Sequence, residues 1–341
     1  MPRWSFEDIK PGEVATYGDR LVTAGEIVDF ARQWDPQPFH LDEAAGRASI
    51  LGGLTASGWH SACLLMRINC DAWIEDSTSL GGPGIEEMAW LKPVRPGDRL
   101  SVRRTVLEAR PSASRPGAGI GRFLFEVMNQ RGEIVMTQRN AILFARRDAP
   151  PPPPGSYDAP APGPEVAAPP VSPDGTMALT FEDVVVGATA QLGAWRFDRD
   201  GVVDFARQWD PQPFHLDEAA AAASPFGRVA ASGWQTACAW MRLMIAARER
   251  ADAARRARGE APAMSGPSPG YRDLRWLKPV YVGDTVSYSS TVVAARRVSR
   301  PGWAVVSHTS AGRNQYGEEV FRFDSSVFMP TRDAHAPLSG S

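Results

Sequence analysis

The sequence has little cysteine, little histidine, no excess of one charge and no long apolar run. Its 341 residues include three Cys and five His, and the formal net charge is −2. Because the basic residues are scattered, neither nucleic acid nor an anionic membrane surface is an expected partner. No apolar stretch is long enough to span a bilayer, and the first residues lack the apolar core of a signal peptide. We therefore expect a cytoplasmic protein.

The few cysteines exclude a disulfide framework. Cys63, Cys70 and Cys238 stand in apolar surroundings and form no CxxC pair. They are expected to be buried free thiols. With so few His and Cys, we expect neither a bound metal nor a redox cofactor.

The chain does contain an internal repeat. Residues 27–45 read IVDFARQWDPQPFHLDEAA, and residues 202–220 repeat them with one difference, Val for Ile, at an offset of 175 residues. The correspondence continues at residues 56–59 and 231–234 and, at an offset of 186, at residues 90–94 and 276–280. The period is far longer than that of a solenoid, so the repeat indicates a duplicated domain.

Composition places the boundary between the two copies. Residues 149–176 contain PPPPP and PAPGPE, a composition that favours extended polyproline II and buries no apolar face. We expect a domain at residues 1–148, a linker at 149–176 and a second domain at 177–333. The larger later offset places extra residues of the second copy at 248–263.

The sequence of the first copy predicts the helices and strands of each half. A capping box at Thr23 and apolar residues at helical spacing predict a helix over 24–34. The prolines at 36 and 38 predict a rigid non-helical turn over 35–40. A short helix is expected at 41–48 and a helix buried on all sides at 57–73. Strands are expected at 13–21, 85–94, 100–107, 120–129 and 134–144.

This order implies an α+β fold in which an antiparallel sheet wraps around a central helix, the shape of a hotdog domain. The repeat then gives two tandem hotdog domains. We expect them to pack as a pseudo-dimer, with the central helices side by side and the sheets joined edge to edge.

The motif DPQPFH, at residues 35–40 and again at 210–215, resembles the D-x-N-P-x-H motif of MaoC-like dehydratases and (R)-specific enoyl-CoA hydratases. Gln37 and Gln212 stand where Asn is usual. The Ala-Ser-Gly segments at 56–58 and 231–233 resemble the A-H-G of that family, with Ser in place of His. The resemblance implies acyl thioesters of coenzyme A or acyl carrier protein as substrates, and reversible hydration of their 2,3-double bond.

The resemblance also implies roles for individual residues. Asp35 with His40, and Asp210 with His215, would hold the water that adds to C3. The backbone N–H groups of Gly58 and Gly233 would bind the thioester oxygen, because a helix N-terminus offers unpaired donors where negative charge develops.

The neighbouring residues admit two interpretations each. Ser57 and Ser232 are expected to be helix N-caps and, secondarily, candidate substrate contacts. The glycines are alternatively helix-packing residues. Lys92 and Lys278 are candidates for binding the coenzyme A phosphates.

The sequence thus predicts an acyl-thioester hydratase or dehydratase with two competent sites and no metal or redox cofactor. Its expected partner is an acyl-CoA or acyl-ACP thioester, and it is either a monomeric pseudo-dimer or a homo-oligomer. A hotdog thioesterase and a non-catalytic acyl-CoA-binding protein remain alternatives.

Overall fold

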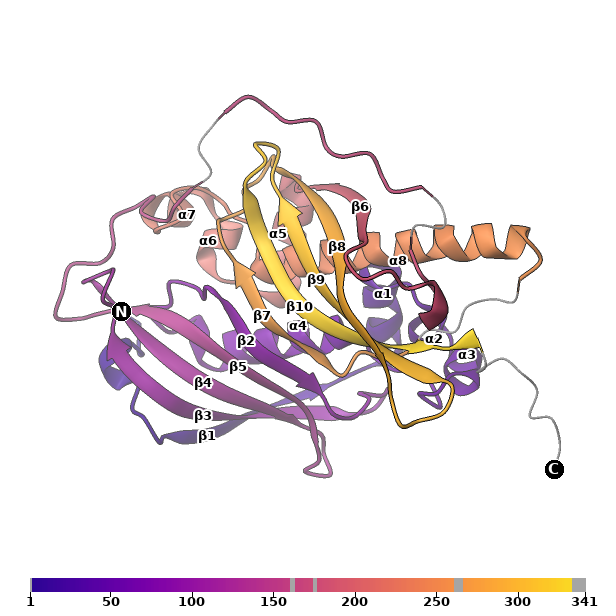
Figure 1. Ribbon diagram of the computed structural model, residues 1–341. Helices are drawn as coiled ribbons and strands as arrows, with labels where there is room; N and C mark the ends of the chain where they lie inside the picture. The colour runs from indigo at the N-terminus through magenta and orange to yellow at the C-terminus, as the bar shows by residue number, and fades with distance from the viewer. Residues whose placement is uncertain (1, 160–162, 174–176, 261–265, 333–341) are drawn as a thin grey trace.

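The computed structural model describes residues 2–159, 163–173, 177–260 and 266–332. The expected linker positions 160–162 and 174–176, the inserted positions 261–263 and the last expected domain residue, 333, lie outside the described residues. Each half is an antiparallel sheet curved around one long helix (Figure 1). The α+β class and the tandem hotdog arrangement are therefore confirmed.

The two halves repeat the same order of elements. The first half contains β1 (Val14–Leu21), α1 (Ala24–Trp34), α2 (Pro38–Leu41), α3 (Glu43–Ala48), α4 (Gly58–Asn69), β2 (Gly84–Trp90), β3 (Arg99–Pro111), β4 (Ala118–Met128) and β5 (Ile134–Ala145). The second contains β6 (Thr189–Arg196), α5 (Arg199–Trp209), α6 (Pro213–Leu216), α7 (Glu218–Ala223), α8 (Gly233–Ala257), β7 (Gly270–Trp276), β8 (Thr285–Arg297), β9 (Trp303–Arg313) and β10 (Glu319–Pro330).

The strands form one continuous sheet. Its order is β1-β3-β4-β5-β2-β7-β10-β9-β8-β6, which reads as the same series from either end once equivalent strands are matched. The join is the antiparallel pair β2 and β7, where Ile85 lies opposite Leu274 and Met88 opposite Tyr271. The predicted edge-to-edge joining is confirmed, and the halves are related by a pseudo-twofold axis.

The helix α1 shows why the repeated sequence folds as it does. The Thr23 side chain accepts a hydrogen bond from the Glu26 N–H at 3.1 Å, which caps the helix. The apolar residues that recur at helical spacing, Ile27, Phe30, Ala31 and Trp34, are all buried. The helix has the bounds that the sequence predicts.

Aromatic rings of α1 and α5 contact each other reciprocally across the pseudo-twofold axis. Phe30 lies 5.6 Å from Trp209, and the equivalent pair, Trp34 and Phe205, lies at 5.5 Å, both edge to face. Such pairs stabilise by about 1 kcal/mol beyond the area that they bury.

The central helices α4 and α8 lie side by side, as predicted. The Sγ atoms of Cys63 and Cys238 are 3.9 Å apart, much farther than a disulfide allows. Both residues and Cys70 are buried free thiols, which confirms the expectation for the cysteines.

Two predicted elements differ in type from the structure, and two differ in their bounds: the strand predicted at 85–94 ends at Trp90, and the helix predicted at 41–48 begins at Glu43. The segment 35–40 is not wholly non-helical: the one-turn helix α2 begins at Pro38, because a proline at the first helical position loses no hydrogen bond. The buried helix over 57–73 is α-helical only to Asn69 and continues as a π-helical turn, Cys70–Ile74. In the second half α8 is 25 residues long, so the extra residues lengthen the central helix.

Among the described residues, no helix combines the length and the apolar composition that a membrane span needs.

Candidate active site

The repeated motif brings a carboxylate and an imidazole together in each half. Asp35 follows the last residue of α1, and His40 lies in α2. Their closest atoms, Asp35 Oδ2 and His40 Nε2, are 3.5 Å apart. The equivalent atoms of Asp210 and His215 are 3.4 Å apart. All four side chains are buried, so the sequence-predicted pairs form in both halves.

The backbone fixes the orientation of each imidazole. Nδ1 of His40 lies 2.7 Å from the carbonyl oxygen of Thr55, and Nδ1 of His215 lies 2.8 Å from that of Ala230. A carbonyl oxygen can only accept a hydrogen bond, so Nδ1 carries the hydrogen and donates this bond. In the neutral imidazole, Nε2 then presents its lone pair to the carboxylate side. This arrangement suits a water molecule that donates to both Nε2 and Oδ2.

Two side chains hold each carboxylate. Ser57 Oγ donates to Asp35 Oδ2 at 2.6 Å, and Gln37 Nε2 donates to Asp35 Oδ1 at 3.0 Å. The second half repeats both bonds, from Ser232 at 2.6 Å and from Gln212 at 2.9 Å. Sequence reasoning assigned no role to the glutamines. Their repetition inside the motif was the available signal.

Ser57 and Ser232 do not line either cavity, contrary to their interpretation as candidate substrate contacts. Each hydroxyl accepts the N–H of the second residue of its helix at 3.2 Å, from Trp59 and Trp234. The N-cap prediction is therefore correct. Because each hydroxyl also donates to its Asp, both serines are fully engaged behind the carboxylates.

Electrostatics favour an ionised carboxylate in the second half. Burial raises the pKa of Asp210, but His215 and the hydrogen bonds from Ser232 and Gln212 outweigh burial and hold the pKa below its ordinary value. An ionised Asp210 can accept a proton, but it has none to donate.

Gly58 and Gly233 begin α4 and α8 and lie on the cavity walls. As first helical residues their N–H groups have no intrahelical acceptor. A Cβ on Gly58 would come within 2.5 Å of the Trp90 ring, and one on Gly233 within 2.3 Å of the Trp276 ring. Packing therefore requires glycine at both positions, and the same glycines leave a backbone donor next to each dyad.

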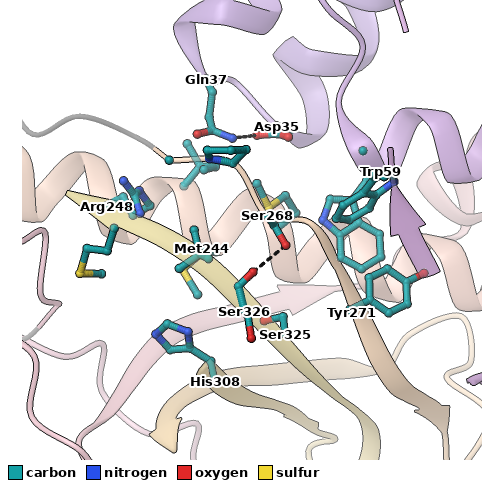
Figure 2. A pocket seen from close by; sticks show the side chains of 18 of the residues that line it. Asp35, Gln37, Trp59, Met244, Arg248, Ser268, Tyr271, His308, Ser325 and Ser326 are labelled. Carbon is teal, nitrogen blue, oxygen red and sulfur yellow. Dashed lines mark hydrogen bonds between the residues drawn. The ribbon is translucent and has the colours of Figure 1, made fainter. Parts of the chain in front are cut away.

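Each dyad opens into a cavity that both halves build. The first cavity, about 460 Å³, combines Asp35, His40 and Gly58 with α8 and the sheet of the second half (Figure 2). The second, about 290 Å³, combines Asp210, His215 and Gly233 with α4 and the sheet of the first half. Neither half alone encloses a complete site.

The comparison with protein families decides the identity of these domains. The MaoC like domain matches twice, at residues 8–118 and 181–313. The chain belongs to the MaoC-like dehydratase family.

Sequence relatives match parts of this MaoC-like chain. Protein MaoC of Klebsiella aerogenes is 29% identical over 133 residues, which are 37% of this chain and 39% of that protein. Mesaconyl-CoA hydratase of Cereibacter sphaeroides is 41% identical over 68 residues, 20% of each. The chain thus aligns with less than half of the length of these two relatives. YdeM of Bacillus subtilis, an uncharacterised protein, is 28% identical over 145 residues, 41% of this chain and 99% of YdeM.

Solved structures share the double arrangement. A MaoC domain protein of Chloroflexus aurantiacus superposes with a TM-score of 0.73 at 16% identity, over 97% of this chain and 99% of that one. A Mycobacterium tuberculosis protein described as a double hotdog superposes with a TM-score of 0.65 at 17% identity, over 95% and 98%. These likenesses show that the MaoC-like halves adopt the double hotdog fold.

Residues of the linker help to line the second MaoC-like site, where Tyr157 and Asp158 form part of the cavity wall. The Tyr157 ring lies edge to face on Phe226 at 4.8 Å, and the Arg115 guanidinium lies over it at 4.3 Å. Its hydroxyl donates to the Leu80 carbonyl, and its N–H donates to the Pro225 carbonyl at 3.0 Å. The expectation that the linker buries no apolar face is therefore wrong, because a single tyrosine supplies one.

The equivalent position of the first site is more exposed. Ile50, the counterpart of Pro225, is 50% exposed, whereas Pro225 is buried. The two candidate phosphate-binding lysines differ in whether the linker contacts them. Lys92 pairs with Glu133 at 2.6 Å, while Lys278 pairs with Glu318 at 2.9 Å and with the linker residue Asp158 at 3.3 Å.

Residues of the second half also line the first cavity. Arg248 on α8 and His308 on β9 are the charged and titratable groups at one end, beyond Met244. Figure 2 shows these three at one side of the pocket and Trp59 and Tyr271 at the other. Among the described residues, no group of three or more His, Cys, Asp or Glu is arranged to hold a metal ion.

The pKa of His308 predicts acid sensitivity. Burial, and after it the Arg248 charge, lower this pKa to about 4. The unfolded chain binds the proton near 6.5, so the free energy of unfolding rises with pH between about 4 and 6.5. We expect His308→Phe to reduce the stability lost from pH 6.5 to 4 by roughly 2 kcal/mol, measured by urea unfolding. An unchanged pH dependence would mean that His308 is protonated in the folded protein.

Proposed function

We propose that this MaoC-like protein reversibly adds water across the 2,3-double bond of a 2-enoyl thioester of coenzyme A or acyl carrier protein, giving a 3-hydroxyacyl thioester. One observation carries the proposal. In both halves an Asp oxygen and a His nitrogen lie 3.4–3.5 Å apart at a cavity, beside an unpaired N–H at the start of a buried helix. Relatives that include a protein named mesaconyl-CoA hydratase support it at the level of the family.

In the proposed reaction each group has one task. The Asp oxygen and the His nitrogen hold one water through its two protons, with its oxygen directed at C3. One member of the dyad takes a proton as the C–O bond forms. The dyad then returns a proton to C2 and ends in its starting state, so that one water is consumed and nothing else. The Gly58 or Gly233 N–H stabilises the negative charge that develops on the thioester oxygen.

The direct test follows the conjugated thioester. We expect the purified protein to lower the absorbance of the conjugated thioester of trans-2-hexenoyl-CoA to an equilibrium value and to form 3-hydroxyhexanoyl-CoA, with no free thiol released. Saturated hexanoyl-CoA serves as the control and should remain intact. Release of thiol from hexanoyl-CoA would instead identify a thioesterase, and binding without any turnover would identify a non-catalytic acyl-CoA-binding protein.

A further inference from the structure

The second cavity contains three buried carboxamide side chains that the proposed reaction does not use. Gln138 and Asn140 are two residues apart on β5 and therefore lie on the same face of the sheet. Asn69 is the last residue of α4. All three are buried, at 4%, 6% and 3% exposure, and all three line the cavity that contains the second dyad. We call these three residues the amide cluster.

The hydrogen bonds of the amide cluster are incomplete. Gln138 Nε2 donates to Asn140 Oδ1 at 3.0 Å, and Asn69 Oδ1 accepts from the Tyr17 hydroxyl at 2.7 Å. Gln138 Oε1 is buried and has no hydrogen-bond partner among the described residues. Asn140 Nδ2 donates a long bond, 3.5 Å, to the Ala141 carbonyl. The cluster thus has an unused acceptor beside a weakly used donor, which is rare for buried polar groups.

The first cavity is lined differently at the equivalent positions. The same turn, residues 129–132 and 314–317, precedes β5 and β10 at an offset of 185 residues. The counterparts of the amide cluster line the first cavity and are mainly apolar: Met244, Phe323 and Ser325. A phenyl ring therefore stands where the second cavity has the Gln138 carboxamide. The two cavities differ in polarity at this position, although their dyads are alike.

The unused groups select the chemistry of a ligand. Gln138 Oε1 needs a hydrogen-bond donor, which neither a carboxylate nor a methyl group supplies. The N–H groups of Asn140 need an acceptor, which an ammonium group does not supply. A hydroxyl group supplies both. The ionised Asp210 in the same cavity also disfavours an anionic chain.

We propose that the second site is built for 2-enoyl thioesters whose acyl chain carries a hydroxyl group. The hydroxyl donates to Gln138 Oε1 and accepts from Asn140 Nδ2, so that Gln138 determines specificity. This inference rests on the proposed function for its catalytic readout. In the first site Phe323 offers no such bond.

The test compares trans-2-hexenoyl-CoA with its 5-hydroxy and 6-hydroxy derivatives in the Asp35→Asn variant, which retains the second dyad. We expect at least one derivative to exceed the parent thioester in kcat/KM about 10-fold, the effect of one buried hydrogen bond. Adding Gln138→Leu, which fills a similar volume, should lower this ratio about 10-fold. Thr137→Val, on the opposite face of β5 and outside the cavity, is the matched control and should leave the ratio unchanged. A ratio that Gln138→Leu does not change would overturn the proposal.

A binding measurement separates this inference from the reaction. In calorimetry with saturated 5-hydroxyhexanoyl-CoA, 6-hydroxyhexanoyl-CoA and hexanoyl-CoA, Gln138→Leu should weaken the binding of at least one hydroxy thioester about 10-fold more than that of hexanoyl-CoA. If hydration is absent but this difference is found, the proposed function fails and the assignment of Gln138 stands. If hydration occurs and neither measurement depends on Gln138, the assignment fails and the proposed function stands.

A second variant keeps the inference testable if Gln138→Leu does not fold. Asn140→Ser installs the residue that the second half has at this position, Ser325, and shortens the side chain that donates to the ligand hydroxyl. It should lower the preference for the same hydroxy thioester, both in turnover by Asp35→Asn and in binding. An unchanged preference in a folded Asn140→Ser protein would mean that the amide cluster does not contact the acyl chain.

Discussion

Replacing Asp35 and Asp210 together by Asn is expected to lower the hydration of trans-2-hexenoyl-CoA roughly a thousandfold, the range that general acid–base catalysis contributes. Asn has the shape of Asp and can still accept hydrogen bonds from Ser57 and Gln37. It cannot take a proton from water. The effect therefore falls on kcat, with little change in the fold.

The control for this double variant lies on the same two helices. Asp29 and Asp204 are equivalent residues whose side chains are 75% and 73% exposed. Converting both to Asn changes the net charge by the same amount without touching a cavity, and activity should be retained. If the double variant at Asp35 and Asp210 keeps full activity, the dyads do not perform the chemistry.

The single variants are expected to be unequal. Asp35→Asn should lower the turnover of trans-2-hexenoyl-CoA about 30-fold, whereas Asp210→Asn should lower it by less than half. The reason is the docked linker: its ring contact on Phe226 and its ion pair to Lys278 are together worth on the order of 2 kcal/mol, which reduces the accessible fraction of the second site about 30-fold.

Removing the cover should restore the second site. Adding Tyr157→Ala to Asp35→Asn is expected to recover most of the lost turnover. Val166→Ala is the matched control, because Val166 binds the Gln315 carbonyl at 2.7 Å through its backbone N–H alone and does not line the second cavity. In calorimetry with saturated hexanoyl-CoA, we expect Tyr157→Ala to tighten binding at the second site about 30-fold relative to the wild-type chain. Equal losses in the two single variants would show that the linker does not limit access.

Sequence reasoning predicts the parts of this fold that depend on short spacings. The bounds of α1 follow from one cap and one apolar stripe, and the two dyads follow from a motif of six residues. The sequence also places Gly58 and Gly233 at the helix starts. It does not reveal that Trp90 and Trp276 pack against them, because those rings come from distant strands.

The missed residues are those whose role depends on the other half. Nothing local to Tyr157 distinguishes it within a proline-rich segment, and nothing local to Gln138 separates it from the other polar residues of its strand. Their surroundings arise only when the two sheets join and the helices lie side by side. The Gln37 and Gln212 hydrogen bonds were closer to being predictable, since both belong to the repeated motif.

Each cavity takes its dyad from one half and much of its remaining wall from the other half. The reactive residues and the residues that surround the rest of a ligand therefore lie in different halves of the gene. Under the proposed function, mutations that change which acyl chain the Asp35 dyad accepts are expected mainly in the second half of the coding sequence, some 200 codons downstream of the dyad itself. A duplicated gene of this kind can therefore diversify its substrate range in one half while the reactive groups of the other half stay fixed. If the second half is exchanged between two such proteins, the substrate specificity of the site that contains the dyad of the first half should therefore change with it.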